Sequence, residues 1–370
     1  MDTIVRDYRE QECCPPPPLN LLWELTLRCN CRCTHCAAGG GTPRADELNT
    51  EEALAVCEQV AELRASSVCL MGGEALLRPD WDLVALRLRE LGVTALGLAT
   101  NGIALDTETW RRLEILGFCQ VVISLDGIIP EVHDRRRRRP GASQAAKRGI
   151  VEMASRPLAH KTVITSVDIG NIGELSAIRN WLLENAPGVT WAINYASPTP
   201  EGRLQRSDSI GVDHFLYLTQ FISANRARYR EQLDIIGAHG LGYCSECYPD
   251  LGDFTWSGCQ AGISTLGLRS DGNVTGCLIL PDHFIEGNVR ERSLSEIWRD
   301  YRSFRYNRSF SADMLTGECS GCRWGEICRG GCREIGFSWT GSPFEAPFCL
   351  YRLESCNDLS VAGNTDEARK

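Results

Sequence analysis

The sequence predicts an α/β protein in which a partial (β/α)6 barrel of the TIM type precedes a small cysteine-rich domain. Three observations lead to this prediction. From residue 19 to about 195, short apolar segments alternate with amphipathic segments of helical length, which is typical of a parallel sheet. Six such units favour an open or partial barrel over a closed eight-unit barrel. Beyond Gly240 the alternation stops, and Gly, Cys and charged residues predominate.

The predicted elements follow one another in a regular order. From their apolar runs, strands are expected at Leu21–Leu27, Val68–Met71, Ala95–Ala99, Val121–Leu125, Thr162–Val167 and Val189–Asn194. Helices are expected at Thr50–Leu63 (with Thr50 as N-cap), about Pro79–Leu91, Thr107–Leu116, Ser143–Met153, Ile172–Glu184 and Val212–Leu233. We expect four segments: an N-terminal extension (1–18), the barrel (19–240), the cysteine-rich domain (241–357) and a disordered tail (358–370).

Composition narrows the classes of function. A net charge of −9 over 370 residues does not favour an electrostatic hold on nucleic acid. The chain has no run of 18 apolar residues and no N-terminal secretion signal, so no membrane span and a cytoplasmic location are expected. In a reducing compartment, its 19 cysteines are better explained as metal ligands than as disulfides.

Three cysteines directly after the first predicted strand form a C-x3-C-x2-C motif: Cys29, Cys33 and Cys36. Three thiolates this close can hold three irons of an iron–sulfur cube and leave the fourth iron open to a substrate or cofactor. Cys31 is interpreted as a non-ligand, because side chains two residues apart would share one cube awkwardly. A zinc site that uses Cys33 and Cys36 with distant partners is the alternative.

The next three predicted strands also end in polar loops that contain glycine: Gly72-Gly73-Glu74, Thr100-Asn101-Gly102 and Ser124-Leu125-Asp126-Gly127. Paired glycines allow the backbone to approach a ligand closely, and Glu74 adds a carboxylate. Because chemistry in such folds lies at the carboxyl ends of the strands, we expect these loops at one rim. The alternatives are a helix N-terminal acid for Glu74 and ordinary turns for the Asn-Gly and Asp-Gly pairs.

Together these motifs resemble the radical S-adenosylmethionine (SAM) enzymes over residues 19–195. The resemblance implies that Cys29, Cys33 and Cys36 bind a 4Fe–4S cluster whose open iron chelates SAM. An electron from the cluster would cleave SAM to a 5′-deoxyadenosyl radical, which abstracts hydrogen from the substrate. The family commonly has proline after the glycine-glycine-glutamate loop, where this sequence has Ala75.

The resemblance also implies contacts to SAM. Glu74, after Gly72 and Gly73, would accept a hydrogen bond from the methionyl ammonium. Asn101 and Ser124 would contact the ribose, and the ring of His35 would lie near the adenine. The five arginines Arg135–Arg139 are either a solvated turn or a site at which Arg137 reaches the cofactor carboxylate and the others meet an acidic peptide.

A second set of cysteines follows at metal-ligand spacing, and it resembles the SPASM domain over residues 244–350. The set comprises Cys259, Cys277, Cys319, Cys322, Cys328, Cys332 and Cys349. The resemblance implies two auxiliary 4Fe–4S clusters, and so three clusters in all. Cys319, Cys322, Cys328 and Cys349 would bind the second, and Cys259, Cys277 and Cys332 the first. Its fourth ligand would be Cys247, less favourably Cys244, or absent to leave an open iron; a pair of zinc sites, each with four cysteine ligands, is the alternative.

Radical enzymes with this extension most often modify ribosomally made peptides, so a peptide maturase that installs a crosslink or another modification is the leading hypothesis. The auxiliary clusters would take an electron from the substrate radical or bind the substrate, and loop 196–210 could line a peptide groove. Expected partners are the peptide or protein substrate, an external flavodoxin- or ferredoxin-type electron donor, and a separate leader-recognition protein, because only about 20 residues precede the first strand.

Other functions stay open at this point. They are sulfatase maturation through formylglycine, modification of a tetrapyrrole or another small molecule, and, from another class, a non-catalytic iron–sulfur electron carrier. The carrier would not need the strand-end loops. No carboxylate can be named from the sequence as the catalytic base.

Overall fold

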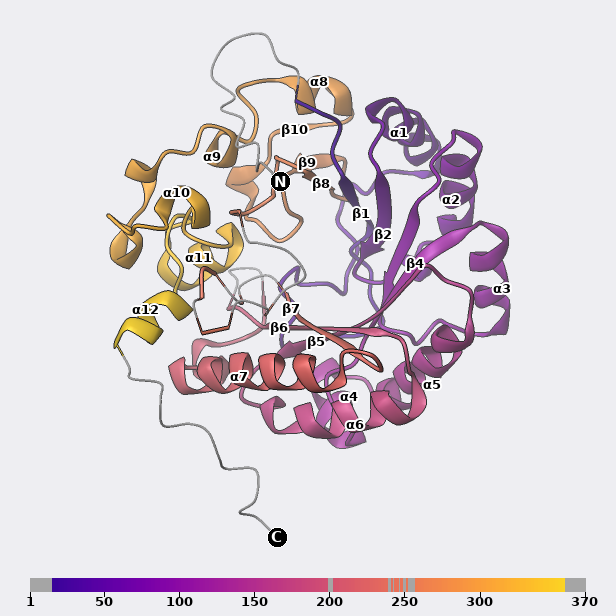
Figure 1. The fold of residues 1–370 in the computed structure, drawn as a ribbon. Coiled ribbons are helices and arrows are strands. Elements are labelled where there is room, and N and C mark those ends of the chain that lie inside the picture. The colour runs from indigo at the N-terminus through magenta and orange to yellow at the C-terminus, as the bar shows by residue number, and fades with distance from the viewer. Residues whose placement is uncertain are drawn as a thin grey trace.

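The computed structural model describes residues 15–198, 202–238, 241, 243–245, 247, 248, 251 and 257–356. Most of the predicted N-terminal extension and the whole of the predicted tail 358–370 lie outside the described residues. The described part of the chain builds one ten-stranded sheet in the order β10-β9-β8-β1-β2-β3-β4-β5-β6-β7. Figure 1 shows this curved sheet with helices around its outer face.

Seven neighbouring strands of this sheet are parallel and build the barrel part of the fold. They are β1 (Asn20–Thr26), β2 (Ser67–Gly72), β3 (Leu96–Thr100), β4 (Phe118–Ser124), β5 (His160–Val167), β6 (Thr190–Tyr195) and β7 (Asp234–Gly237). The six predicted strands and their parallel arrangement are confirmed. The seventh, β7, was not predicted, because four residues are too few to reveal a period of two.

Seven helices accompany these strands. They are α1 (Thr50–Leu63), α2 (Trp81–Glu90), α3 (Thr107–Ile115), α4 (Pro130–Arg137), α5 (Ala142–Ser155), α6 (Leu175–Asn185) and α7 (Val212–Tyr229). The predicted N-cap of the first helix is wrong by one residue. Asn49 Oδ1 accepts a hydrogen bond from the Glu52 N–H at 3.0 Å, and Glu52 Oε2 accepts one from the Asn49 N–H at 2.9 Å. This reciprocal capping box begins α1 at Thr50.

Helix α4 was missed because its sequence has no apolar stripe. Pro130 is at its first turn, where a missing N–H costs nothing. Its buried side chains are those of His133, Arg136 and Arg137 rather than apolar residues. A helix that buries charges cannot be recognised by hydrophobic periodicity, although it can be recognised by the partners that the charges find.

The cysteine-rich region continues the same sheet on the other side of β1. Strand β8 (Thr265–Leu268) pairs in parallel with β1, with Leu21 opposite Leu266. Strands β9 (Asn273–Thr275) and β10 (Gly287–Asn288) extend it in antiparallel fashion. The helices of this region are α8 (Leu294–Arg299), α9 (Arg305–Arg308), α10 (Gly325–Cys328), α11 (Arg333–Thr340) and α12 (Leu350–Cys356). The shared sheet fixes this region against the barrel.

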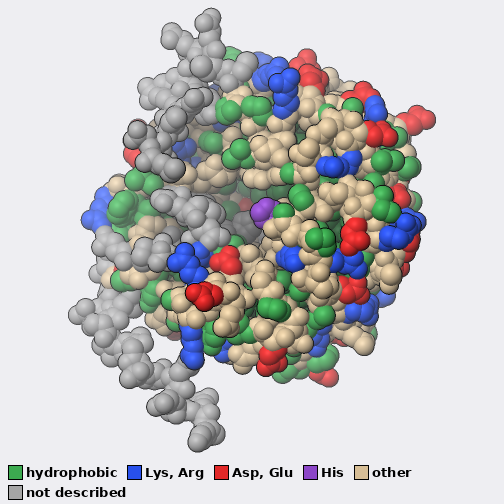
Figure 2. All heavy atoms as spheres, turned by 45° about the vertical axis from the view of Figure 1, so that its right-hand side comes forward, with side chains coloured by type: hydrophobic (Ala, Val, Ile, Leu, Met, Phe, Trp, Pro, Cys, Tyr) green, Lys and Arg blue, Asp and Glu red, His purple; other side chains and the backbone are tan. Residues whose placement is uncertain are grey.

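One hydrophobic core serves both regions. It includes Leu21 and Trp23 of β1 together with Leu266 and Leu268 of β8, all almost fully buried. Short 3₁₀ helices complete the described elements: η1 (Ala75–Leu77), η2 (Ile172–Glu174), η3 (Arg206–Asp208), η4 (Asp282–Phe284), η5 (Ala312–Met314) and η6 (Gly317–Cys319). Within the described ranges, no helix has both the length and the apolarity to cross a membrane. The face in Figure 2 is hollowed near its middle, and basic and acidic side chains are intermingled over it.

Candidate active site

Each of the three predicted ligand sulfurs accepts a hydrogen bond, two of them from the loop after β1 and the third from Arg137 at the end of α4. Cys29 Sγ accepts from the Cys31 N–H at 3.4 Å, and Cys36 Sγ accepts from the Gly40 N–H at 3.2 Å. Cys33 Sγ accepts from Arg137 Nη1 at 3.6 Å. N–H donors stabilise the negative charge of a thiolate, so these surroundings fit the sulfur ligands of an iron–sulfur cluster.

Cys31 lies between two of these sulfurs. Its side chain is almost fully buried, and its thiol is hydrogen-bonded to those of Cys29 and Cys33. The hydrogen bond from Cys31, helped by the Arg137 guanidinium and opposed by burial, lowers the pKa of Cys33 to about 6. Cys33 is therefore largely ionised at neutral pH, as a metal ligand must be. That Cys31 is itself a non-ligand stays a prediction.

The paired glycines at the end of β2 allow this strand to meet the cluster loop. A Cβ on Gly73 would lie 2.3 Å from the carbonyl oxygen of Leu27 and 2.5 Å from that of Arg28. The Glu74 N–H donates to the same Arg28 oxygen at 2.8 Å. The backbone of the paired glycines thus approaches another group closely, and that group is the backbone of the cluster loop. Contact of Gly72 and Gly73 with SAM stays a prediction.

Glu74 joins the ends of β2 and β3 below the rim. Its side chain is 1% exposed, and its carboxylate accepts from Thr100 Oγ1 and from the Asn101 N–H, both at 2.8 Å. Burial raises the pKa of Glu74. The same carboxylate also caps η1, as the helix-terminus alternative predicted. Contact with a methionyl ammonium stays a prediction, and lone pairs on both oxygens allow it.

Asn101 braces the cluster loop from β3. Its Nδ2 donates to Asn30 Oδ1 at 2.7 Å and also reaches Cys29 Sγ at 3.8 Å, while its Oδ1 accepts from the Ile103 N–H at 3.0 Å. Ser124 is the last residue of β4 and is partly exposed. The structure thus gives Asn101 a role at the cluster loop, and the ribose contacts of both residues stay predictions.

A buried charge network lies behind Cys33. Asp126, which is fully buried, forms an ion pair with Arg137 Nη2 at 2.7 Å and contacts His35 Nε2 at 3.2 Å. Burial alone would raise the pKa of Asp126, but the Arg137 guanidinium holds it below its ordinary value. Burial lowers the pKa of His35 to about 3, so its imidazole is neutral at neutral pH, with Nε2 at 3.2 Å from Asp126 Oδ2.

This network was not recognised from the sequence. Of the arginine run, Arg135, Arg138 and Arg139 are exposed, as the solvated-turn alternative predicted, while Arg136 and Arg137 are buried. Arg136 pairs with the buried Asp168. The short sequence separation of Asp126 and Arg137 could have indicated the pair. Only α4 lies between them, and this helix returns Arg137 to the end of β4, where Asp126 lies.

The position of His35 bears on the predicted adenine contact. Its ring is turned to Asp126, and among the described residues its buried Nδ1 has no hydrogen-bond partner. An acceptor nitrogen without a donor beside the cluster loop fits a bound group that carries N–H or O–H. The adenine contact of His35 stays a prediction. Arg137 contacts Cys33 and Asp126, and its contact with the cofactor carboxylate also stays a prediction.

The loop after β6 joins the cluster loop to the cysteine-rich region. Arg203 Nη2 donates to the carbonyl oxygens of Gly39 and Gly40, each at 2.8 Å. Arg206 donates to the carbonyl of Trp339 in α11. Ser197 Oγ donates a hydrogen bond at 2.7 Å to Oε1 of Glu334, a residue that lies two positions after Cys332. The described part of the predicted peptide-lining loop therefore spans both regions.

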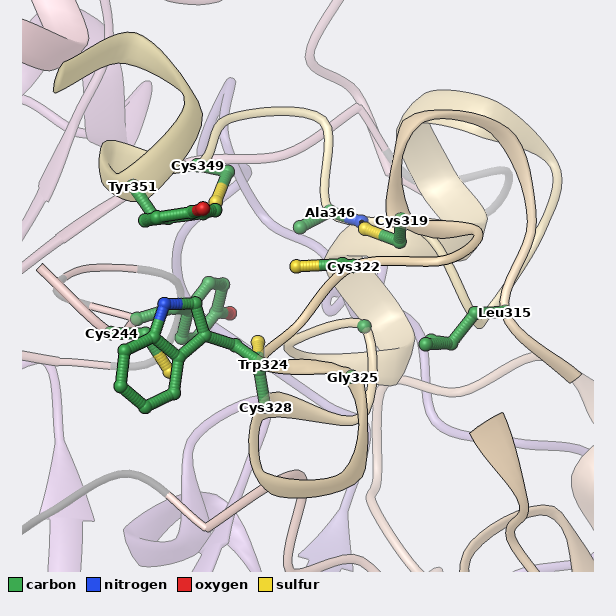
Figure 3. A pocket seen from close by; sticks show the side chains of 12 residues that line it. Cys244, Leu315, Cys319, Cys322, Trp324, Gly325, Cys328, Ala346, Cys349 and Tyr351 are labelled. Carbon is green, nitrogen blue, oxygen red and sulfur yellow. Dashed lines mark hydrogen bonds between the residues drawn. The ribbon is translucent and has the colours of Figure 1, made fainter. Parts of the chain in front are cut away.

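The seven cysteines of the second set lie in two groups. Cys319, Cys322, Cys328 and Cys349 line one pocket that is partly open to solvent (Figure 3). In the other group, a hydrogen bond from Cys332, opposed by burial, lowers the pKa of Cys259 to about 5, and Cys277 lies beside them. Across the described ranges, no three Cys, His, Asp or Glu side chains converge on a point to hold a single metal ion. The cysteine thiols that bind a 4Fe–4S cluster surround the volume of the cluster and do not converge on one point.

The two candidates for a fourth ligand of the first auxiliary cluster differ in position. Cys244 lines the cavity of the other group and is hydrogen-bonded to Cys328. The alternative that Cys244 serves the first cluster is therefore not supported by its geometry. Cys247 has an exposed side chain, and its ligand role stays a prediction.

Two family models match the chain, one over the part that carries Cys29, Cys33 and Cys36 and the other over the part that carries Cys259, Cys277, Cys319 and Cys322. The radical SAM superfamily model covers residues 23–182, and the SPASM iron–sulfur cluster-binding domain covers residues 259–323. The chain is a radical SAM enzyme with a SPASM domain. Membership implies SAM and iron–sulfur clusters as cofactors, and the donor sets described above fit them.

Relatives and solved structures agree with this assignment. An AdoMet-dependent heme synthase of Methanosarcina barkeri is 29% identical over 90% of this chain and 97% of that protein. Mycofactocin maturase MftC of Mycobacterium tuberculosis is 27% identical over 89% of this chain and 82% of that protein. Streptococcus suis SuiB bound to precursor peptide SuiA has a TM-score of 0.71 at 17% identity, over 90% of this chain and 76% of that chain. The enzyme anSMEcpe with bound AdoMet and Kp18Cys peptide has a TM-score of 0.69 at 18% identity, over 92% of this chain and 95% of that chain.

Acidification is expected to destabilise the site through His35. An unfolded histidine binds a proton near pH 6.5, whereas the folded pKa of His35 is about 3, so unfolding takes up a proton between these values. The free energy of unfolding should then fall as the pH falls below 6.5, by at most about 1.4 kcal/mol per pH unit for this residue. Urea unfolding of the cluster-free protein at pH 7.5, 6.5, 5.5 and 5.0 measures the slope.

The matched variant is His35→Gln, which keeps an N–H donor for Asp126 and cannot titrate in this range. It should flatten the dependence on pH. His133, whose pKa burial lowers to about 4, contributes in the same direction and remains in the variant. An equal slope in both proteins would contradict the assignment of the effect to His35.

Proposed function

We propose that this radical SAM/SPASM enzyme abstracts hydrogen from a ribosomally synthesised peptide and installs a crosslink or another post-translational modification. The observation that carries the proposal is that barrel and SPASM region match together, over 90% of the chain, the fold of SuiB bound to its precursor peptide. A mycofactocin maturase among the relatives, also matched over both regions, supports the same assignment.

The proposed roles follow from the position of each group. Cys29, Cys33 and Cys36 would hold the cluster that binds SAM, and the two SPASM groups would hold two further clusters, three in all. When bound, the first cluster and SAM supply the 5′-deoxyadenosyl radical. A substrate between the barrel rim and α11 would lie near Ser197 and Glu334, next to the first auxiliary group. We propose an external flavodoxin- or ferredoxin-type electron donor and a separate leader-recognition protein as further partners.

The loop that carries Arg203 and Arg206 would form one wall of the peptide site. Arg203 is committed to the carbonyls of the cluster loop and Arg206 to α11. Movement of a bound peptide against this loop would therefore be transmitted both to the cluster loop and to α11. This arrangement suits a substrate that must contact barrel and SPASM region at once.

A second candidate is modification of a tetrapyrrole side chain. The observation that favours it is the near end-to-end match to the heme synthase of Methanosarcina barkeri, of which 97% is covered at 29% identity. A radical that abstracts hydrogen can start either reaction. The two candidates therefore share every cofactor and differ in the molecule that would bind near the cluster loop.

Isotope transfer separates the two candidates. The reconstituted enzyme would be incubated anaerobically with SAM, a reductant and either a deuterated peptide encoded by a neighbouring reading frame or a deuterated iron coproporphyrin. Mass spectrometry would follow deuterium in 5′-deoxyadenosine and the mass of each substrate. We expect deuterium from the peptide to appear in 5′-deoxyadenosine, and the mass of the peptide to fall by the hydrogen atoms it has lost. Transfer from the porphyrin alone would overturn the peptide assignment.

A further inference from the structure

The second auxiliary cavity contains one thiol more than a cluster needs. Cys319, Cys322, Cys328 and Cys349 line it, and so does Cys244. Figure 3 shows Cys244 on the side of the cavity where Cys328 and Trp324 lie. A 4Fe–4S cluster takes four cysteine ligands, and the four downstream cysteines can supply them. The presence of a fifth thiol, that of Cys244, in this cavity therefore needs an explanation.

The chain around Cys244 is anchored to elements that carry cluster ligands. The hydroxyl of the preceding residue, Tyr243, accepts a hydrogen bond from the Cys332 N–H at 2.9 Å, and the Tyr243 side chain is 2% exposed. A Cβ on Gly331 would lie 2.6 Å from the Tyr243 ring, so the ring packs directly on this backbone. The following residue, Ser245, is hydrogen-bonded to Glu354 in α12, the helix after Cys349. Cys244 is thus held between two ligand-bearing segments.

The backbone at Cys244 is also held in an unfavourable conformation. Its φ of 45° lies in the left-handed region, which residues with a side chain seldom adopt. Such conformations persist where the surroundings over-determine them, and they cluster at functional sites. The conformation directs the side chain of Cys244 to the cavity and to Cys328.

The side chains of Cys244 and Cys328 line the same cavity and are hydrogen-bonded to each other, with Cys328 as the donor in the protein without clusters. A thiolate bound to iron carries no proton, so once Cys328 binds a cluster only Cys244 can donate in this S–H···S contact. We propose that Cys244 is a positioning residue of the second auxiliary cluster, which donates a hydrogen bond to the Cys328 ligand and is itself a ligand of neither auxiliary cluster. Donors to cluster sulfurs stabilise the reduced state and raise the reduction potential.

The test compares Cys244→Ala and Cys244→Ser with the control Cys57→Ala, which removes a core thiol of α1 that belongs to none of the cluster groups, in the reconstituted enzyme. Iron content, EPR-monitored redox titration and melting temperature are measured without substrate. We expect Cys244→Ala to keep its iron and to shift the potential of the second auxiliary cluster to a more negative value. Cys244→Ser, whose hydroxyl can donate, should restore part of the shift, and Cys57→Ala should leave this cluster unchanged.

Two outcomes would overturn the proposal. Loss of about four irons per chain in Cys244→Ala, with the fold intact by melting temperature, would make Cys244 a ligand. An unchanged potential of the second auxiliary cluster would remove its role. The inference rests on the proposed assignment of Cys328 to that cluster and not on the nature of the substrate. Because no substrate is present, its failure is distinguishable from failure of the peptide assignment.

Discussion

Replacing Cys29, Cys33 and Cys36 together by alanine should abolish the formation of 5′-deoxyadenosine and leave the SPASM clusters in place. Each of the three sulfurs accepts a hydrogen bond from an N–H donor of the loop after β1 or of Arg137, and none of them belongs to the two downstream groups. Without them the barrel rim has no ligands for a cluster that could chelate SAM. Total iron should fall by about four atoms per chain, the content of one cubane.

The matched control is Cys57→Ala, which removes a thiol of α1 that is fully buried in the core and contacts the carbonyl oxygens of Ala53 and Val84. It should keep its iron and its SAM cleavage and lose only a small amount of stability. Iron analysis and chromatography of SAM-derived products measure both quantities. Continued 5′-deoxyadenosine formation by the triple variant would contradict the assignment, and loss of all iron would show that the clusters depend on one another.

Family membership makes the chain an enzyme rather than an electron carrier. A carrier would need clusters but no cofactor loops, whereas this chain places Glu74, Asn101 and the paired glycines against the cluster loop. SAM cleavage that depends on the three front cysteines would tie that activity to these residues.

The strands and the position of the cluster loop could be predicted from the sequence because each depends on a local signal. Apolar runs such as that of β4 read directly as buried parallel strands. A C-x3-C-x2-C run after the first strand needs no knowledge of the rest of the fold. Strands β7 and β8 were beyond reach, because each has four residues and pairs with a strand distant in sequence.

The side-chain network at the site was less predictable for a different reason. Asp126 and Arg137 were both noted in the sequence, but their pairing depends on α4, a helix without an apolar face. The capping residue of α1 was missed because Asn49 and Thr50 are both good N-caps, and only the contact with Glu52 decides between them. Cys244, the less favoured candidate for the first auxiliary cluster, lines the cavity of the other group, because sequence spacing cannot show which of the two cysteine groups a loop approaches.

These cases share a physical cause. A thiolate, a carboxylate or a guanidinium takes its function from the partner it finds at hydrogen-bonding distance, and that partner comes from another element. Arg137 illustrates this dependence, because it contacts Cys33 and Asp126 from the end of α4. Its position makes it the residue through which the fold holds both the charge balance and the geometry of the cluster loop.

Substituting Arg137 by methionine should therefore destabilise the protein strongly and alter the first cluster. The variant leaves the fully buried Asp126 carboxylate without its cation, and breaking a buried ion pair from one side costs about 3–5 kcal/mol. It also removes the N–H donor of Cys33, so the reduction potential of the first cluster should become more negative. Chemical denaturation and EPR-monitored titration measure the two effects separately.

Two companion variants show whether the pair itself is responsible. Arg135→Met, in the same helix but exposed, should change the free energy of unfolding by no more than about 0.5 kcal/mol. The double variant Arg137→Met/Asp126→Asn removes the stranded charge along with its partner and should recover much of the stability, while the potential stays shifted because Cys33 still lacks its donor. The single variant Asp126→Asn completes the cycle. If the double variant is as unstable as the sum of Arg137→Met and Asp126→Asn, the two side chains do not act as a pair, and the cost would instead arise from the packing of α4 against the cluster loop.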